Sequence, residues 1–278
     1  MKQKKVAIIA NSNPLANKLE TEVDALVNKL QVENKLVQVS PYLYEKDSPY
    51  DPKELINLTN ALFMDPQTEM ILDLSGGDLG NQVIAGLNYG VIADSKAVYY
   101  GYSDLTTVLN AILSQTGKPS VLYHARYVGP ISDLMDPQFY QFSFQFLQGQ
   151  SLKGQVIGGN IRCLLKLAGT KYWPDFKDKI LFLESLSGDV KRMQTFLNQL
   201  QQIGVFDQIK GLILGSFTEM EKDDLRPTME EMVQSMVRAD LPLIKTNQIG
   251  HQKDAKPIII GAHYDFQQDN FSIENYPW

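Results

Sequence analysis

Cysteine is nearly absent from this chain of 278 residues: Cys163 is the only one, so no intramolecular disulfide can form. A single thiol without disulfides is typical of a reducing compartment, and we expect a cytoplasmic protein. Long apolar runs are missing as well. The run that follows the N-terminal lysines covers only residues 6–10, too short for the hydrophobic segment of a signal peptide, and none approaches the roughly 20 residues of a membrane span.

The sequence also lacks a basic segment and the common metal and phosphate motifs. Its 32 acidic and 26 basic residues are interspersed, with a formal net charge of −6, and this pattern does not indicate nucleic-acid binding. It has no paired cysteines, no His-x-x-x-His and no EF-hand pattern, so we expect no metal site. Dinucleotide and phosphate-loop fingerprints are missing too, and we expect no cofactor.

What is present is the apolar pattern of a globular α/β protein. In the first half, short apolar strands alternate with amphipathic helices, which is typical of a parallel sheet covered on both faces. The pattern predicts strands at 6–10, 36–39, 70–74, 97–101 and 121–123, and helices at 15–30, 52–63, 79–88 and 104–115. Either Ser103 or Asp104 is available as the N-cap of the last helix.

The second half repeats this alternation after a less regular segment. Residues 129–154 are rich in Phe, Tyr and Gln, and we interpret them as a helix and a connection. Beyond them we expect strands at 155–157, 180–184, 210–215, 257–261 and 271–273, and helices at 190–203 and 227–238. The domains predicted in this way are residues 1–135 and 154–278, joined by residues 136–153.

The most informative segment is a glycine-rich turn that follows an apolar strand, Ile71-Leu-Asp-Leu-Ser-Gly-Gly-Asp-Leu-Gly-Asn81. A strand, a turn and a helix in this order direct backbone N–H groups at whatever lies above the turn, and the helix dipole favours negative charge there. Such a place suits an oxyanion. The residue at the helix entrance is then expected to perform the chemistry, and it is Gly80.

Together with Gly101-Tyr-Ser-Asp-Leu-Thr106, this turn resembles the serine peptidase family of LD-carboxypeptidases and microcin C7 immunity peptidases. The family turn reads Gly-Gly-x-x-Ser-Asn, and here every fixed position of residues 76–81 matches except the serine. The segments that extend the resemblance are Gly158-Gly159-Asn160, Gly169-Thr170, Lys179–Glu184, Gly211–Phe217 and Ile249–His251. The resemblance implies an N-terminal flavodoxin- or Rossmann-like domain, a smaller mixed α/β domain, and an active site in the groove between them.

The resemblance also implies site residues, because the family hydrolyses amide bonds with a Ser-Glu-His triad. Glu184 and His251 match the acid and the base, and Gly80 stands at the nucleophile position. The implied oxyanion donors are the backbone N–H groups of Gly77 and Asn81, and the same turn contains Gly76 and Asp78 as binding residues. Read without the family, Glu184 is a strand-end carboxylate, His251 a loop histidine and Gly80 a helix-entry glycine.

Two functions remain open at this point. The first is a member of the family that has lost peptidase activity and binds a peptide, a muropeptide or a peptidyl-nucleotide. The second is a carboxypeptidase-type hydrolase that uses Ser75, or a water molecule activated by His251. A third reading is that Gly80 is a variant position in a native serine enzyme. The resemblance further implies a homodimer.

Other polar residues have weaker roles in this interpretation. Ser103 and Arg126 are possible substrate contacts, since Arg suits the bidentate recognition of carboxylates, although a solvated loop explains Arg126 as well. We read Ser75 as a strand-end serine that bonds its own turn, in preference to a nucleophile. We expect Cys163 to be a buried, inert thiol and His263 to be structural.

Overall fold

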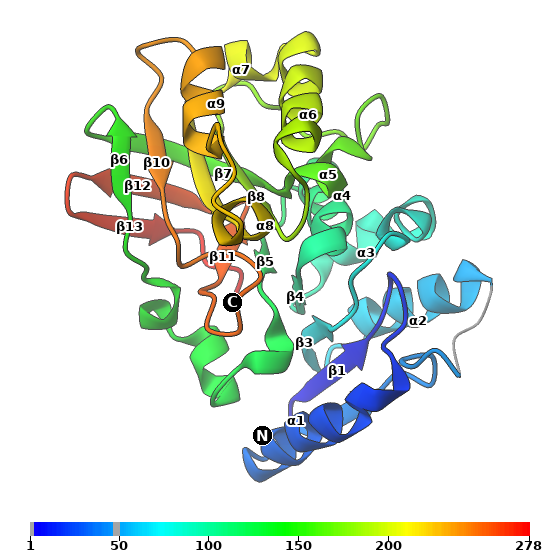
Figure 1. Ribbon diagram of the computed structural model, residues 1–278. Helices are drawn as coiled ribbons and strands as arrows, with labels where there is room; N and C mark the ends of the chain where they lie inside the picture. Colours follow the sequence, from blue (N-terminus) through cyan, green and yellow to red (C-terminus); the bar gives the residue numbers. More distant parts are fainter. Residues whose placement is uncertain (1–2, 47–50) are drawn as a thin grey trace.

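Two β-sheets form the framework of the chain, as Figure 1 shows for the computed structural model, which describes residues 3–46 and 51–278. The first sheet has the strand order β11-β5-β4-β3-β1-β2. Its strands are β1 (Lys5–Ile9), β2 (Leu36–Val39), β3 (Thr68–Asp73), β4 (Val98–Gly101), β5 (Ser120–Leu122) and β11 (Ile258–Ile260). All neighbours pair in parallel except β11, which is antiparallel to β5.

Amphipathic helices cover this sheet, as the periodicity predicts. They are α1 (Glu20–Val32), α2 (Pro52–Met64), α3 (Tyr89–Asp94) and α4 (Thr106–Thr116). Helix α1 buries Val23, Leu26 and Leu30, which recur at the spacing of one helical face. Helix α2 starts with Pro52 after Asp51, whose side chain accepts a hydrogen bond from the backbone N–H of Lys53.

The second sheet has the order β13-β12-β7-β8-β9-β10-β6. Its strands are β6 (Gln145–Gln148), β7 (Leu152–Asn160), β8 (Ile180–Ser185), β9 (Gly211–Phe217), β10 (Leu243–Lys245), β12 (His263–Gln267) and β13 (Asn270–Glu274). The helices of this part are α5 (Ile161–Leu165), α6 (Val190–Gln202), α7 (Val205–Gln208), α8 (Thr218–Lys222) and α9 (Met229–Met236). Strands β7 to β10 are parallel; β6 is antiparallel to β10, β12 is antiparallel to β7, and β13 is antiparallel to β12.

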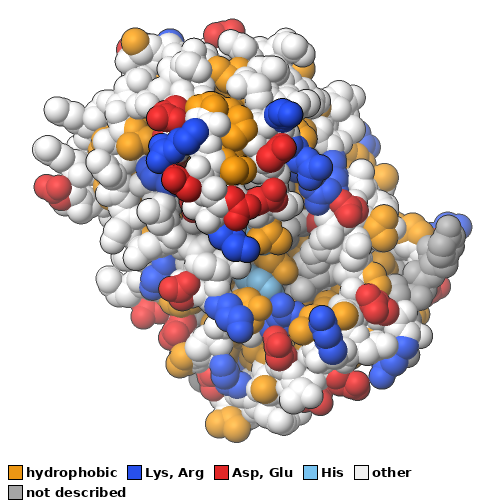
Figure 2. Space-filling model, viewed as in Figure 1, with side chains coloured by type: hydrophobic (Ala, Val, Ile, Leu, Met, Phe, Trp, Pro, Cys, Tyr) orange, Lys and Arg blue, Asp and Glu red, His pale blue; other side chains and the backbone are white. Residues whose placement is uncertain are grey.

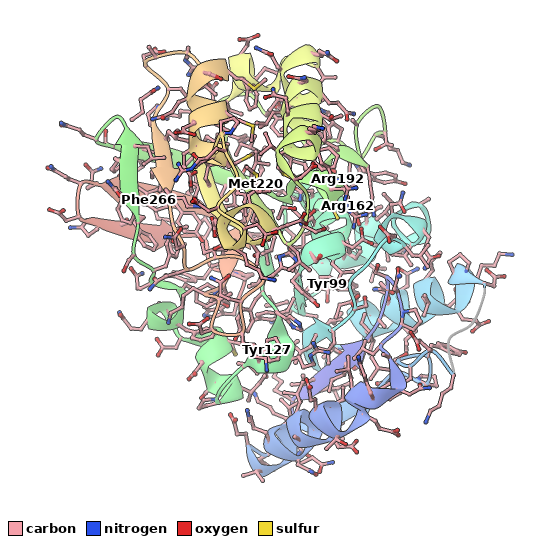
Figure 3. All side chains as sticks on the ribbon, in the orientation of Figure 1. Tyr99, Tyr127, Arg162, Arg192, Met220 and Phe266 are labelled. Atoms are coloured by element: carbon pink, nitrogen blue, oxygen red, sulfur yellow. The ribbon has the colours of Figure 1, made fainter. Side chains whose placement is uncertain are left out.

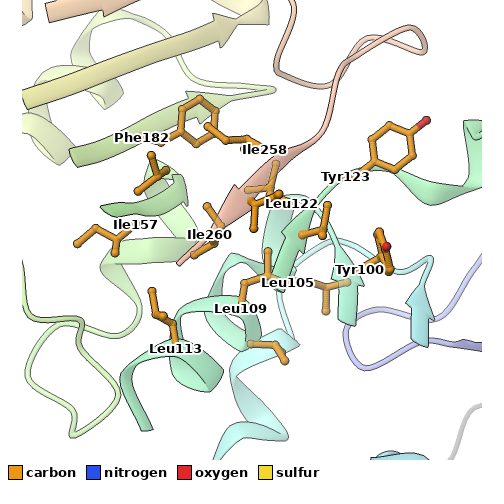
Figure 4. Packing of buried hydrophobic residues seen from close by; sticks show 14 of the residues in the cluster. Tyr100, Leu105, Leu109, Leu113, Leu122, Tyr123, Ile157, Phe182, Ile258 and Ile260 are labelled. Atoms are coloured by element: carbon orange, nitrogen blue, oxygen red, sulfur yellow. The ribbon is translucent and has the colours of Figure 1, made fainter. Parts of the chain in front are cut away.

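A continuous hydrophobic core joins the two sheets. Figure 4 shows Ile258 and Ile260 of β11 between Leu122 of the first sheet and Phe182 of the second. Strand β11 comes from the C-terminal part of the chain but pairs with β5 of the first sheet. The predicted domain boundary at residue 154 had assigned the strand at 257–261 to the C-terminal domain. The N-terminal sheet is therefore completed by a distant segment.

Several predicted elements differ in the structure. The helix expected at 79–88 is replaced by two 3₁₀ turns, η2 (Gly80–Gln82) and η3 (Ile84–Gly86), before α3 begins. The helix expected within 129–154 is absent from that segment, all of which the structure describes; it holds the 3₁₀ turns η6 (Ile131–Met135) and η7 (Pro137–Tyr140) and the edge strand β6. Strand β7 is also much longer than the stretch 155–157 that the sequence indicated.

The strand order places the glycine-rich turn at a functional position. Strand order reverses between β1 and β3, and ligands of open α/β sheets bind at the carboxyl ends of the strands where this reversal occurs. The segment after β1 and the turn after β3 meet there, in a bridge between Asn13 and Gly76. In the described part of the chain, no helix has the length and apolar character needed to cross a bilayer.

Candidate functional site

The glycine-rich turn is held in shape by side chains from the segment that follows β1. The backbone N–H of Asn13 donates to the carbonyl of Gly76 at 3.0 Å, and the Oδ1 atom of Asn13 accepts from the N–H of Asp78 at 2.9 Å. Gly77 has φ = 111°, and a Cβ atom there would collide with the Asn13 side chain. Glycine is therefore required at position 77 by both backbone conformation and close packing.

Gly80 is buried and its backbone N–H donates to the Oδ2 atom of Asp104 at 2.5 Å. An ideal Cβ built on Gly80 would come 2.8 Å from this Oδ2 atom and 2.9 Å from the backbone carbonyl oxygen of Asp104. A side chain at position 80 thus fits only after the segment around Asp104 shifts. The turn therefore lacks the serine hydroxyl, and its packing also leaves no room for a side chain at position 80.

Asp104 itself lies in a buried polar network that spans both parts of the molecule. Its carboxylate is fully buried, accepts from the Oγ atom of Ser12 at 2.6 Å, and forms an ion pair with Lys166, which follows α5. Because an unpaired carboxylate at this depth would carry a large desolvation penalty, Lys166 stabilises it there. This contact ties the turn of the first sheet to the segment that follows β7.

Asp78, expected as a binding residue, is occupied by a neighbouring cation. Its carboxylate pairs with Arg162 of α5, whose Nη2 atom also donates to the carbonyl of Gly77 at 2.7 Å. The hydrogen bond from Arg162 lowers the pKa of Asp78. Among the described residues, the backbone N–H of Gly77, an expected oxyanion donor, has no acceptor, while Asn81 is exposed in η2.

Glu184 and His251 are brought into contact from distant parts of the chain. Glu184 is the last residue but one of β8, which is buried throughout, and His251 lies in the loop between β10 and β11. The Nδ1 atom of His251 lies 2.7 Å from the Oε2 atom of Glu184, and the two side chains are 6% and 1% exposed. The distance is that of an ion pair, but the contact lacks the alignment of a good hydrogen bond. Figure 2 shows a hollow at the level of this loop, with a histidine at its floor.

The environment of His251 sets its charge. Burial lowers the pKa of the imidazole, but the carboxylate of Glu184 outweighs this effect and the pKa lies above its usual value. The Nε2 atom is buried and has no hydrogen-bond partner among the described residues. A buried donor without an acceptor costs about 1–3 kcal/mol, which a ligand oxygen that reached it would recover.

Next to this pair lies a row of rings that the sequence did not indicate. The ring centroids of Tyr102 and His251 are 5.7 Å apart, those of Tyr102 and His124 3.7 Å, and those of His124 and Tyr127 4.4 Å. We call Tyr102, His124 and Tyr127 the aromatic row. Burial and the nearby Arg126 lower the pKa of His124 to about 3, so its imidazole is neutral. Figure 3 shows Tyr127 in the lower half of the view and Arg162 of α5 above it.

Arg126 and Ser103 do not have the environments that were expected. The Nη2 atom of Arg126 donates to the Oη atom of Tyr127 at 3.2 Å and lies 3.3 Å from the Nε2 atom of His124, while its Nε atom lies 3.4 Å from a carboxylate oxygen of Glu22. Its guanidinium thus has partners within the chain. Ser103 has φ = 52°, and neither it nor Asp104 caps helix α4, which lacks a side-chain cap.

Ser75, the alternative nucleophile, is engaged elsewhere. Its Oγ atom donates to the Oδ1 atom of Asp73 at 2.6 Å and accepts from the N–H of Ser12 at 2.9 Å, and the residue is 1% exposed. Burial raises the pKa of Asp73 to about 6, against hydrogen bonds from Ser75 and Tyr99 that lower it. The hydroxyl of Ser75 therefore belongs to a buried network centred on a carboxylate, whereas a serine nucleophile pairs with a base.

The remaining candidate residues lie in surroundings that indicate a structural role. Cys163 is fully buried in α5, and this burial raises the pKa of its thiol. His263 lies in β12 and pairs with Glu274 of β13. Gly158 and Gly159 lie in the last part of β7, and Asn160 caps α5 by accepting from the N–H of Cys163. Within the described residues, no cluster of side chains has the composition of a metal site.

Comparison with known proteins gives the same match in both halves of the chain. The models of the LD-carboxypeptidase N-terminal and C-terminal domains match residues 6–124 and 153–266. A probable murein peptide carboxypeptidase of Bacillus subtilis is 24% identical over 92% of this chain and 86% of its own length. The microcin C7 self-immunity protein MccF of Escherichia coli is 22% identical over 80% and 78%.

Solved structures share the fold. MccF in complex with glutamyl sulfamoyl guanosine superposes with a TM-score of 0.82 at 18% identity, covering 98% of this chain and 96% of that one. A muramoyltetrapeptide carboxypeptidase from Oxalobacter formigenes gives a TM-score of 0.79 at 21% identity, covering 97% and 98%. The two-sheet α/β architecture expected from the sequence is confirmed.

Proposed function

The chain belongs to the LD-carboxypeptidase family, and from this premise we propose that it binds a peptide, a muropeptide or a peptidyl-nucleotide without hydrolysing it. The proposal rests on Gly80, which stands where the family resemblance expects the nucleophile serine, and on the contact between Glu184 and His251. Loss of the serine from such a triad lowers the rate by about 10⁴–10⁶. The remaining pair then serves as a polar floor for a bound ligand.

The relatives suggest the classes of ligand. One is named as a probable murein peptide carboxypeptidase, and MccF structures contain aspartyl sulfamoyl adenosine or glutamyl sulfamoyl guanosine. Both classes combine a peptide or aminoacyl part with polar groups. We infer that this chain binds a ligand of one of these classes. Because position 80 is a glycine, we propose that the chain does not cleave the ligand.

Calorimetric titration of the wild-type protein with a murein tetrapeptide and a non-hydrolysable aminoacyl sulfamoyl adenosine tests the binding. We expect saturable binding of at least one ligand and a weaker affinity for His251→Gln. His263→Gln is the matched control because His263 lies on β12 and pairs with β13. Absence of binding to the whole panel would remove the proposed function.

The competing hypothesis is a hydrolase that uses Ser75 or a water molecule activated by His251. The contacts of Ser75 with Asp73 and the burial of the His251 Nε2 atom both favour the binding protein. If the wild type cleaves a ligand, Ser75→Ala and His251→Gln separate the two routes, since each variant abolishes turnover by one of them. The family also leads us to propose a cytoplasmic homodimer, which light scattering and fractionation test.

A further inference from the structure

A cavity of about 280 Å³ lies at the start of strand β8, away from the glycine-rich turn. Lys179, the residue before β8, lines this cavity, and Glu184 of the candidate site lies towards the other end of the same strand. Because an extended strand rises about 3.3 Å per residue, Lys179 is roughly 16 Å from Glu184 along β8. The cavity is therefore separate from the candidate site.

The cavity has an apolar floor and one aromatic wall. Leu113 of α4 and Ile157 of β7, which Figure 4 labels at the left of the buried cluster, are both buried and line it. The wall is the half-buried Trp173, followed by Pro174. The ring of Trp173 lies 4.7 Å from that of Phe176, which is buried. The indole is thus packed in place, and such a surface suits a flat aromatic ring.

The segment that carries the wall is fixed by hydrogen bonds at both ends. The backbone N–H of Trp173 donates to the carbonyl of Thr170 at 3.2 Å, and that of Lys179 donates to the carbonyl of Phe176 at 3.1 Å. The Nε2 atom of Gln115 in α4 donates to the carbonyl of Lys171 at 2.9 Å. These bonds hold the cavity in shape without a ligand, which reduces the entropic cost of binding one.

The charges that line the cavity have an excess of one sign. Lys171 is exposed and Lys179 half-buried, and in the described part of the chain neither Nζ atom has a carboxylate within ion-pair distance. The one acidic residue of the lining is Asp175, whose Oδ1 atom accepts from the backbone N–H of Lys177 at 3.0 Å. Two ammonium groups therefore face one carboxylate, and an anion is favoured.

The end of helix α4 decides where the anionic group of a ligand lies. Gly117, the C-cap of α4, also lines the cavity, and a helix C-terminus carries partial negative charge. An anion is repelled there and attracted to Lys171 and Lys179. We propose that this cavity is a second binding site, which takes an aromatic anion with its ring against Trp173 and its charged group at the two lysines. The volume is close to the lower end of the roughly 300–1,000 Å³ of small-molecule sites, and so suits a single ring.

NMR of the indole N–H groups tests the proposal, because the chain has two tryptophans and Trp278→Phe assigns their signals. The probes are benzenesulfonate, which has a ring and a charge, benzenesulfonamide, which lacks the charge, and methanesulfonate, which lacks the ring. We expect benzenesulfonate to shift the Trp173 signal saturably and to leave Trp278 unchanged. The other two probes should bind about tenfold more weakly, since each loses one of the two contacts.

A matched pair of lysine variants isolates the charge. Lys177 is exposed, lies two positions from Lys179 and does not line the cavity. Lys179→Gln should weaken benzenesulfonate binding about fivefold, the upper value for one exposed ion pair, and Lys177→Gln should leave it unchanged. Trp173→Leu should abolish the transfer of saturation from the protein to benzenesulfonate, with an unchanged Trp278 signal as evidence that this variant is folded.

Four results overturn the inference. They are the absence of a saturable Trp173 shift, equal affinity for benzenesulfonamide, equal losses in the two lysine variants, and undiminished binding by folded Trp173→Leu. Shifts confined to His251 would place the probe in the candidate site and count as the first of these results. Because the cavity is separate from that site, none of these outcomes bears on the proposed function.

Discussion

The Oδ2 atom of Asp104 lies 2.5 Å from the backbone nitrogen of Gly80, in the space that a side chain at position 80 would enter. The carboxylate that closes this space comes from the start of the neighbouring strand-to-helix connection, where η4 (Ser103–Leu105) precedes α4. It is fixed by Ser12 and Lys166, so it cannot swing away freely. Position 80 is thus surrounded by a buried network.

This packing predicts that any Cβ at position 80 destabilises the protein. Gly80→Ala and Gly80→Ser should each lower the free energy of unfolding by about 1–3 kcal/mol, the usual cost of overpacking. The two variants should differ little, because the Cβ atom meets Asp104 in both. Urea denaturation measures the effect, and an unchanged midpoint for Gly80→Ala would show that the turn relaxes without cost.

Lys166 should be essential to stability because it neutralises the buried Asp104. Lys166→Met leaves that carboxylate unpaired, and we expect a loss of about 3 kcal/mol in the free energy of unfolding. The control is Lys153→Met, which removes the pair between the exposed Lys153 and Asp265. Chemical denaturation should give a clear loss for the first variant and almost none for the second. Equal losses would mean that Asp104 does not need Lys166.

Glu184 should control the charge of His251. Since burial alone lowers the pKa of the imidazole and Glu184 raises it, Glu184→Gln should lower the pKa of His251 below its wild-type value. Histidine NMR titration measures this change, with His263 as an internal reference. A pKa of His251 that does not change in Glu184→Gln contradicts the contact described above.

Asp73 should make stability fall as the pH rises. Burial raises its pKa from 3.8 to about 6 in the folded protein, so the folded state keeps a proton that the unfolded state loses between these values. Protonated Asp73 therefore contributes fully to the free energy of unfolding below pH 3.8. As the pH rises to 6, this contribution falls by about 3 kcal/mol. Above pH 6 the contribution is constant.

Asp73→Asn removes this titration. The difference in unfolding free energy, wild type minus variant, should fall between pH 4 and pH 6 and then level off. Urea denaturation at several pH values measures the slope, which is independent of the hydrogen bonds that the amide changes. A difference that is constant over this range would show that Asp73 is ionised throughout.

Local periodicity predicted the elements whose structure depends on nearby residues. The stripe of Val23, Leu26 and Leu30 specifies α1, and Met193, Leu197 and Leu200 do the same for α6. The segment after Gly80 has similar apolar spacing but forms 3₁₀ turns, because Asp104, a residue 24 positions away, takes the N–H of Gly80. Strand β11 shows the same limit, since its partner β5 lies far away in sequence.

Only the site residues that belong to a recognised sequence motif were predicted. Glu184 and His251 were paired through the order of family segments, and the structure places them in contact. Tyr102 belongs to such a motif as well, but its stacking on His124 depends on how two strand ends meet.

Cleavage measured by mass spectrometry in the wild type, Gly80→Ser and Gly80→Ala tests the central claim most directly. The substrates are a murein tetrapeptide and a peptidyl-adenylate. We predict no cleavage by the wild type or by Gly80→Ala, and measurable cleavage by Gly80→Ser, because only this variant restores the hydroxyl that the family's triad uses at this position, with Glu184 and His251 already in contact. Cleavage by the wild type at the rate of an enzyme would contradict the claim that this chain binds its ligand without hydrolysing it.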